Sequence, residues 1–370
     1  MREAAALPSV TKYGTNPTPI DELGQRALRR RGRFWIGGLS LALAATVVLA
    51  VCVGAVGLPP SAVVRVIGHH LAGTPAEPSW PLSQDAIVWR VRLPRVLLGA
   101  AVGAALAVCG VALQAMVRNL LADPYLLGIT SGASTGAAAA ILFGFGAGLG
   151  EHALPASAFL GALAASAAVF VIARAAGRIT SLRLLMAGVA VGYALYATTG
   201  FLIFASDSAE GSRSVLFWLL GSLGLARWGV PLTSVLVIVC GTVAALTLWS
   251  RHLDALAIGD ETAHTLGVSP TRLRVRLLCL VSLCVGAVVA ASGGIGFVGL
   301  VIPHLARRLV GAAHHRAVPV AALTGAVFLV WADVLARVLL LPRELPIGII
   351  TAIVGAPFLL VLVKRFHTTA

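Results

Sequence analysis

The sequence predicts an all-α polytopic membrane protein, and three observations support this fold class. Hydrophobic residues make up 58% of the 370 residues and charged residues only 11%. The mean hydropathy is +0.94, whereas about a quarter of the residues of a soluble domain are charged. Apolar stretches of roughly 20 residues, the length that crosses the hydrocarbon core as a helix, recur between short basic or Gly/Pro-containing breaks.

These apolar stretches are continuous and lack the strict alternation of barrel strands, so helices are favoured over a closed barrel. Breaks in charge, Gly and Pro divide the chain into about ten expected spans. The spans are expected near residues 35–57, 93–117, 127–148, 154–173, 183–205, 229–249, 273–292, 296–312, 318–338 and 346–363.

The basic residues predict the orientation of these spans. With the amino terminus inside, 20 of the 28 Lys and Arg residues fall in cytoplasmic segments and 8 on the opposite side, as the positive-inside rule requires when both termini are cytoplasmic. Topology therefore explains the net charge of +14, and no nucleic-acid surface is expected. The exceptions on the outer side are Arg65, Arg90, Arg92, Arg95, Arg213, Arg227, Arg337 and Arg343.

The domain organisation is expected to be a basic, disordered cytoplasmic tail over residues 1–34 and a membrane domain over residues 35–366. The tail is placed to touch anionic lipid, and the first apolar run is too long for the core of a signal peptide. All five cysteines lie inside apolar segments, where they behave as small hydrophobes, with no disulfide or metal-ligand spacing.

Several function classes are disfavoured because the sequence lacks the residues that they need at the required positions. A phosphate-binding loop needs a lysine after a Gly-rich turn, and the lysines are Lys12 and Lys364, so no ATP-hydrolysing site, catalytic residue or cofactor is expected in this chain. A secondary carrier needs ionisable groups at mid-depth, but Asp123 and Asp333 fall near span ends. A metal site is not expected at the paired histidines in the breaks, His69 with His70 and His314 with His315.

Three of the outer arginines crowd into VWRVRLPR at residues 88–95. Arg90, Arg92 and Arg95 either extend to lipid headgroups or form a basic patch that docks an acidic external partner. Asp333 and Arg337 are four residues apart on one helix face and are placed to pair with each other.

The break at residues 251–274, RHLDALAIGDETAHTLGVSPTRLR, is long enough for a short amphipathic helix. Apolar side chains in an exposed loop indicate a surface for a partner protein. A helix lying on headgroups is the alternative, and Asp254, Asp260 and Glu261 count against it because the cytoplasmic leaflet is negative. The residues expected to present apolar surface are Leu253, Leu256, Ala257, Ala263 and Leu266.

Five motifs in order resemble the FecCD family of ABC importer permeases over roughly residues 35–366. They are RLPRVLLGA, QAMVRNLLADPYLLGITSGASTGA, GDETAHTLGV, GGIGFVGLVIPHLARRLVG and ELPIGIITAIVGAPFLLVLVKR. The resemblance implies ten helices per subunit in the bacterial cytoplasmic membrane, with two permease copies or close paralogues lining the pathway. It also implies two ATPase subunits, which use ATP and Mg, and an extracytoplasmic binding protein.

The resemblance also implies roles for individual residues. Arg92, Arg95 and Arg337 match arginines that dock the binding protein. The coupling helix near residues 253–268 matches the segment that seats in the ATPase, with Gly259, Asp260, Glu261, Thr262, Leu266 and Gly267 as its coupling residues. The cytoplasmic gates match Asn119 and Leu121 after the second span and Thr180 and Ser181 before the fifth.

The sequence departs from the family pattern at Leu120, where a proline is usual and would break the helix. Glycines four apart, such as Gly99 with Gly103 and Gly188 with Gly192, are expected to serve helix packing. The expected substrate is an iron chelate, a ferric siderophore or haem, with cobalamin as the alternative. A metal-ion permease, a secondary carrier and a non-transport scaffold are the less favoured classes.

Overall fold

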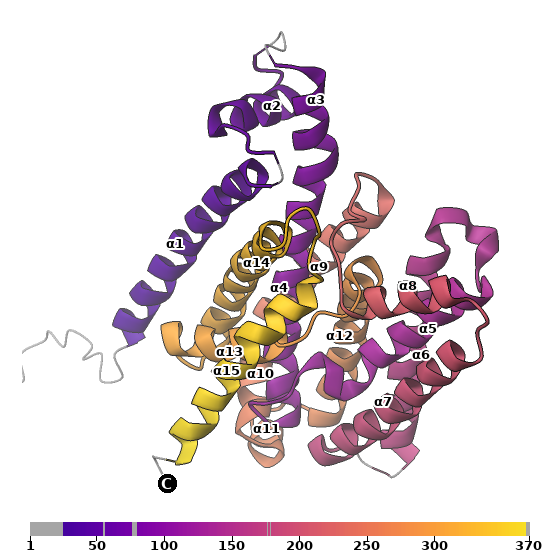
Figure 1. Ribbon diagram of the computed structural model, residues 1–370. Coiled ribbons are helices and arrows are strands. Elements are labelled where there is room, and N and C mark those ends of the chain that lie inside the picture. Colours follow the sequence, from indigo (N-terminus) through magenta and orange to yellow (C-terminus); the bar gives the residue numbers. More distant parts are fainter. Residues whose placement is uncertain (1–24, 55, 76–79, 176, 178, 368–370) are drawn as a thin grey trace, which may run out of the picture.

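The computed structural model describes residues 25–54, 56–75, 80–175, 177 and 179–367, and every regular element in those ranges is a helix (Figure 1). Three are non-α helices: η1 (Ala86–Arg92), η2 (Pro124–Leu127) and η3 (Ala147–His152). The α-helices are α1 (Gln25–Cys52), α2 (Pro60–Ala72), α3 (Leu82–Asp85), α4 (Leu93–Val117), α5 (Ile129–Phe143), α6 (Ala153–Ala175), α7 (Ser181–Phe204), α8 (Ala209–Leu219), α9 (Val230–Leu248), α10 (Ser250–Ile258), α11 (Asp260–Thr265), α12 (Pro270–Ser292), α13 (Val298–Val310), α14 (His314–Val338) and α15 (Ile347–His367).

Each predicted span corresponds to a helix of this bundle: α1, α4, α5, α6, α7, α9, α12, α13, α14 and α15. Within the described ranges, 7 helical segments are long and apolar enough to cross a membrane. The stretches 129–143 and 347–361 are shorter apolar helices, and α13 has 13 residues. The predicted all-helical membrane class is therefore confirmed.

The start of the first helix corrects one expected boundary. Helix α1 begins at Gln25 and includes the basic run RALRRRGR, so residues 25–34 are not the disordered tail that composition predicted. Arginine has high helix propensity, which lets the helix extend past the apolar run into the region of the headgroups. The rest of the predicted tail, residues 1–24, lies outside the described residues.

Helix α4 forms the centre of the bundle. Its most apolar window is 83% buried, compared with 17% for α1 and 22% for α7. Helices α9, α12, α13 and α14 pack around it. In Figure 1, α1 lies at one flank and α5 to α8 form a group at the other.

Glycine allows this central packing, as the sequence predicted. A Cβ on Gly103 would lie 2.2 Å from the carbonyl oxygen of Gly325 in α14, and one on Gly110 would lie 2.0 Å from that of Gly299 in α13. Real Cβ atoms do not approach backbone so closely, so only glycine permits these helix contacts. In lipid, where no hydrophobic effect drives helices together, such close approach strengthens the van der Waals packing that holds them.

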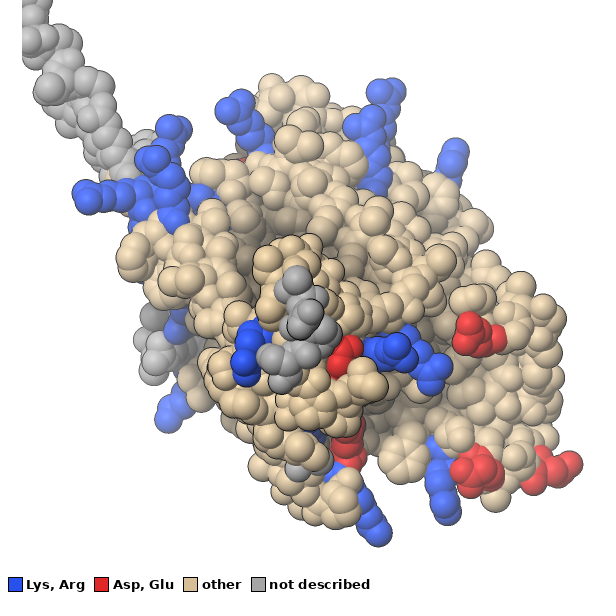
Figure 2. Space-filling view, turned by 90° about the horizontal axis from the view of Figure 1, so that it is seen from above, with Lys and Arg blue, Asp and Glu red and all other residues tan. Residues whose placement is uncertain are grey.

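The two ends of the bundle carry different short helices (Figure 1). Helices α2 and α3 project at one end, and α10 and α11 lie at the other. By the predicted orientation, α2 and α3 are extracytoplasmic and α10 and α11 are cytoplasmic. Figure 2 looks down on the α2–α3 end, where basic side chains stand at separate places, some beside acidic ones, on a largely uncharged surface.

Candidate functional site

The predicted coupling segment folds as two short helices, α10 and α11, separated by Gly259. Leu253, Leu256 and Ala263 are fully buried in the chain's own core, so the expectation that they offer apolar surface to a partner was wrong. An amphipathic face needs an apolar contact, and here the bundle supplies it. Ile258 and Leu266 do remain exposed, at 69% and 63%.

Arg274, on α12, is the most deeply buried charged side chain near these helices, at 1% exposure. It lies in a stripe of α12 that includes buried Leu273, Leu277, Leu278 and Val281. A cation in such a stripe requires compensating partners, because burial without them is costly.

Asp260 supplies the main partner of Arg274. The Arg274 Nη1 and Nη2 groups donate to Asp260 Oδ2 and Oδ1 at 2.9 and 2.7 Å, a bidentate geometry that fits the planar guanidinium. The hydrogen bonds from Arg274 lower the pKa of Asp260, and the positive charges of Arg274 and then Arg118 act in the same direction. Arg118 Nη2 lies 3.8 Å from Asp260 Oδ1.

The same guanidinium also bonds to one predicted gate residue, Ser181, and to backbone carbonyls that lie close to both predicted gate segments. Its Nε and Nη1 donate to the carbonyl oxygens of Met116 and Ile179 at 3.4 and 3.3 Å. Its Nη2 donates to Ser181 Oγ at 3.0 Å, and Ser181 Oγ donates to the Met116 carbonyl at 3.1 Å. We call Arg274, Asp260, Ser181 and the Met116 and Ile179 carbonyls the Arg274 clamp.

The predicted gate residues occupy the two backbone turns beside this clamp. Helix α4 ends as Arg118 adopts a left-handed conformation with φ of 54°. Asn119 Oδ1 then accepts from the Leu121 N–H at 2.9 Å, and the Asn119 carbonyl accepts from the Ala122 N–H at 3.1 Å. This turn stops the helix without the proline of the family pattern, so Leu120 does not disrupt it.

The second turn leads into α7. Thr180 caps this helix by accepting from the Arg183 N–H at 3.4 Å, as threonine commonly does at an N-cap. Ser181, the first residue of α7, is buried in the clamp. The structure therefore brings Ser181 and Asp260 together on Arg274, whereas Asn119 and Leu121 are exposed and join the clamp only through the backbone next to Met116.

The remaining predicted coupling residues lie on α11 or next to it, and none of them is a hydrogen-bond or ion-pair partner of Arg274. Glu261 and Gly267 are exposed, and Thr262 is half-buried. Helix α10 is held separately, because the His314 N–H donates to Asp254 Oδ1 at 3.0 Å and His314 Nδ1 lies 2.6 Å from the same oxygen.

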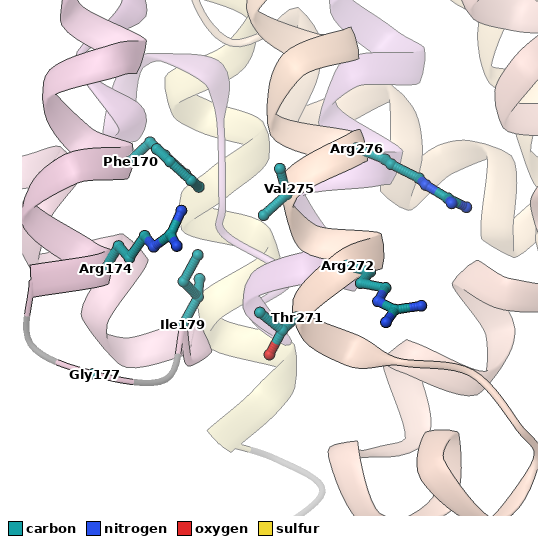
Figure 3. Close-up of a pocket in the computed structure, with 8 residues that line it drawn as sticks. All are labelled: Phe170, Arg174, Gly177, Ile179, Thr271, Arg272, Val275 and Arg276. Atoms are coloured by element: carbon teal, nitrogen blue, oxygen red, sulfur yellow. The ribbon is translucent and has the colours of Figure 1, made fainter.

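A cavity of about 460 Å³ opens between the end of α6 and the start of α12, next to the clamp (Figure 3). Phe170, Arg174 and Ile179 form one wall and Thr271 and Val275 the other, while the Arg272 and Arg276 heads extend away from these two walls. Ile179 also belongs to the clamp through its carbonyl, so this space lies beside the segment that the clamp restrains.

At the opposite end, two of the three predicted docking arginines hold the end of α1. Arg92 donates to the carbonyls of Val51 and Val56 at 2.7 and 2.6 Å. Arg337 donates to the carbonyls of Ala50 and Val53 at 3.1 and 3.0 Å. The last carbonyls of a helix lack partners within it and attract cations, so both guanidiniums are buried caps.

The third arginine, Arg95, joins an ion-pair network. Its Nη2 lies 2.9 Å from Asp333 Oδ1 and 2.9 Å from Glu344 Oε2. Asp333 also lies 3.1 Å from Arg337 Nε, which confirms the pair predicted from their spacing. All three arginines thus have partners within the chain, and their docking role stays a prediction, whereas Arg90 is exposed at the same end.

Charge and hydropathy in the sequence do not distinguish Arg274, the residue with the most polar partners in the cytoplasmic site, from the other cytoplasmic cations. Its position in the buried stripe 270, 273, 274, 277, 278 and 281 was the available signal, because a cation at helical spacing among apolar residues indicates a buried charge with a dedicated partner.

An apolar bundle of helices with a pair of short amphipathic helices at its cytoplasmic end defines a class, the multi-pass α-helical membrane proteins. Comparison with known proteins identifies the family within this class. The chain belongs to the FecCD transport family, whose model matches residues 42–365, and it is an ABC transporter permease of that family.

The relatives of this chain are named for the transport of different substrates. The chain is 41% identical to the cobalamin import system permease protein BtuC of Halobacterium salinarum, over 88% of each chain. It is 42% identical to the hemin transport system permease protein HmuU of Yersinia pestis, over 77% of this chain and 86% of that protein. A solved structure of a metal-chelate type ABC transporter in an inward-facing conformation matches with a TM-score of 0.77 and 34% identity, over 89% of this chain and 98% of that one.

Proposed function

We propose that this chain is the membrane-spanning subunit of an importer that moves an iron chelate, a ferric siderophore or haem, across the cytoplasmic membrane. Two separate ATPase subunits that use ATP and Mg would drive it, and an extracytoplasmic binding protein would deliver the substrate to a pathway between two permease copies or close paralogues. The family and the hemin relative support this proposal.

The Arg274 clamp is the observation that carries the mechanism. Its Asp260 belongs to α11, the helix predicted to seat in the ATPase, while Ser181 begins α7 and Met116 lies one turn before the Asn119–Leu121 gate segment. A movement of α11 would therefore pull one buried guanidinium, and that guanidinium would move both gate segments together. A rigid connection of this kind would let one displacement of α11 change the positions of both gate segments.

The pathway itself needs only weak contacts with the substrate, because a conduit must release what it admits. The clamp performs no bond chemistry. Its proposed role is to transmit movement of α11 to the gates, so its loss should separate transport from hydrolysis.

The test is transport by the importer reconstituted with its ATPase and binding protein. Arg274→Gln should lower uptake about tenfold or more, equivalent to about 1.4 kcal/mol of coupling, while ATP hydrolysis changes by less than about twofold. Arg276→Gln is the matched control, because it removes the same charge from an exposed position two residues along α12. Normal uptake by Arg274→Gln, or by Asp260→Asn with Glu261→Gln, would contradict the coupling role.

Cobalamin is the second candidate substrate, favoured by the Halobacterium relative, whose identity is almost the same as that of the hemin relative. The ligand of the companion binding protein separates the two. Direct titration of that protein with ferric siderophores, haem and cobalamin should give its tightest binding with an iron chelate, and tightest binding of cobalamin would replace the iron proposal.

A further inference from the structure

A second cavity, of about 620 Å³, lies between the amino-terminal part of α1 and the first turns of α10 and α14. It is on the cytoplasmic side by the predicted orientation and is separate from the Arg274 clamp. Basic side chains dominate its lining, which consists of Arg29, Gly32, Arg33, Ile36, Ser250, Arg251, His315 and Arg316.

Among the residues that the structure describes, no acid lines this cavity, and four arginines and a histidine from three helices converge on it. Among the described residues, none of these five forms an ion pair, and Arg316 Nε is buried without a hydrogen-bond partner. The nearby carboxylate of Asp254 is already bonded to His314. Like charges at such proximity repel unless an anion lies between them.

The backbone around the cavity adds to its preference for an anion. Ser250 and Arg251 begin α10, and His315 and Arg316 lie in the first turn of α14. Helix amino termini carry partial positive charge, which favours an anion nearby, and the first N–H of α14, that of His314, is already bonded to Asp254. The first turns of both helices contain no acidic residue.

The place of the cavity in the bundle determines which anion can reach it. Helix α1 packs on one flank and leaves most of its surface uncovered, at 17% buried over its apolar window. Helix α1 lies against the Arg316 side chain at Gly32, where a Cβ would be 3.1 Å from Arg316 Cδ. The arginines therefore line a space that opens where α1 enters the cytoplasmic leaflet, which is rich in anionic lipid.

We propose that this cavity binds the phosphoryl headgroup of an anionic phospholipid from the cytoplasmic leaflet. The lipid would neutralise the arginines and join α1, α10 and α14. The cavity of Figure 3 is a poorer candidate, because the Arg272 and Arg276 heads point away from its walls. Free phosphate offers the same chemistry, and an acidic surface of a partner protein is the competing class of ligand.

The experiment is native mass spectrometry of the purified full chain in mixed micelles with equal amounts of phosphatidylglycerol and phosphatidylcholine. The wild type should retain phosphatidylglycerol preferentially. Each basic residue near an anionic surface contributes about fivefold to binding, so Arg251→Gln should lower this preference about fivefold and Arg251→Gln with Arg33→Gln about 25-fold. Arg272→Gln, which removes one exposed cytoplasmic charge elsewhere, should leave it within about twofold.

The outcomes separate the possible ligands. Competition by inorganic phosphate at unchanged ionic strength would identify a free-phosphate site and overturn the lipid assignment. Equal retention of both lipids by the wild type would also overturn it, as would a loss of phosphatidylglycerol preference in Arg272→Gln as large as that in Arg251→Gln. An Arg251→Lys variant that keeps the wild-type preference would support it. Only the permease is present, so the result is independent of ATPase coupling and of the transported substrate.

Discussion

At the scale of single residues, the burial of Arg274 next to a partly exposed Asp260 makes the two ends of their ion pair unequal. The Arg274 side chain is 1% exposed and that of Asp260 is 34% exposed. Removing the acid leaves a cation in the interior without its counterion, whereas removing the cation leaves an acid that still reaches water and lies 3.8 Å from Arg118.

The first prediction follows from this asymmetry. Asp260→Asn should destabilise the chain by about 3 kcal/mol, the lower end of the range for breaking a buried pair, and Arg274→Gln should cost less. The thermal unfolding midpoint in detergent would measure both, with Arg276→Gln as the exposed control. A larger loss in Arg274→Gln than in Asp260→Asn would contradict the asymmetry.

A second prediction concerns Leu120. In the turn closed by the Asn119 carbonyl and the Ala122 N–H, Leu120 is the second residue, a position that favours proline in common β-turns. Leu120→Pro should therefore be tolerated and should stabilise the chain by up to about 1 kcal/mol through a less flexible unfolded state. Thermal unfolding checks this, and a loss of more than 1 kcal/mol would show that the turn excludes proline.

At the scale of helices, the extracytoplasmic arginines stabilise the end of α1 before they can serve any partner. Arg92 and Arg337 donate to carbonyls at or beyond the last turn of that helix. Arg95 is instead paired with acids. A charge reversal at Arg92 would thus disturb the fold and docking together, so lost docking in that variant alone would not identify a contact.

The third prediction separates the two roles. Arg92→Gln should destabilise the chain by about 1–3 kcal/mol, because buried carbonyls lose their donor, while Arg90→Gln should leave stability within about 0.5 kcal/mol. Thermal unfolding and titration with the binding protein should be measured on both. If exposed Arg90 is the docking cation, its variant should weaken binding, most at low salt, and binding unaffected by Arg90→Gln would exclude it.

The helices that cross the membrane were predictable, and the contacts between them were less so. Continuous hydropathy located α4, α12 and α14 because lipid imposes length and apolarity on every span. The same criterion cannot tell whether Leu253 and Leu256 face a partner or the chain's own core. Nor did it separate Arg274 from the exposed Arg276, since the positive-inside rule counts both alike.

At the scale of the molecule, the predicted gate residue Ser181 lies at the start of a helix of which most of the surface is uncovered. Helix α7 starts at Ser181 in the clamp and is 22% buried over its apolar window. Its exposed face carries Tyr193, Tyr196 and Phe201, which are 73%, 75% and 64% exposed. Tyrosine is enriched where one surface meets another and is uncommon in the middle of a lipid-facing stripe.

The last prediction is that this face of α7 contacts a second permease copy. Tyr193→Ala with Tyr196→Ala should weaken dimerisation by about 10- to 100-fold, since truncating interface tyrosines commonly costs more than 1 kcal/mol each. Light scattering in detergent would give the mass, and co-purification of tagged with untagged chains would show exchange. Val237→Ala with Leu248→Ala on α9, also exposed apolar positions, should leave the dimer intact. A wild-type chain that stays monomeric at every concentration would contradict a contact between two copies and would leave a close paralogue as the alternative partner of this face.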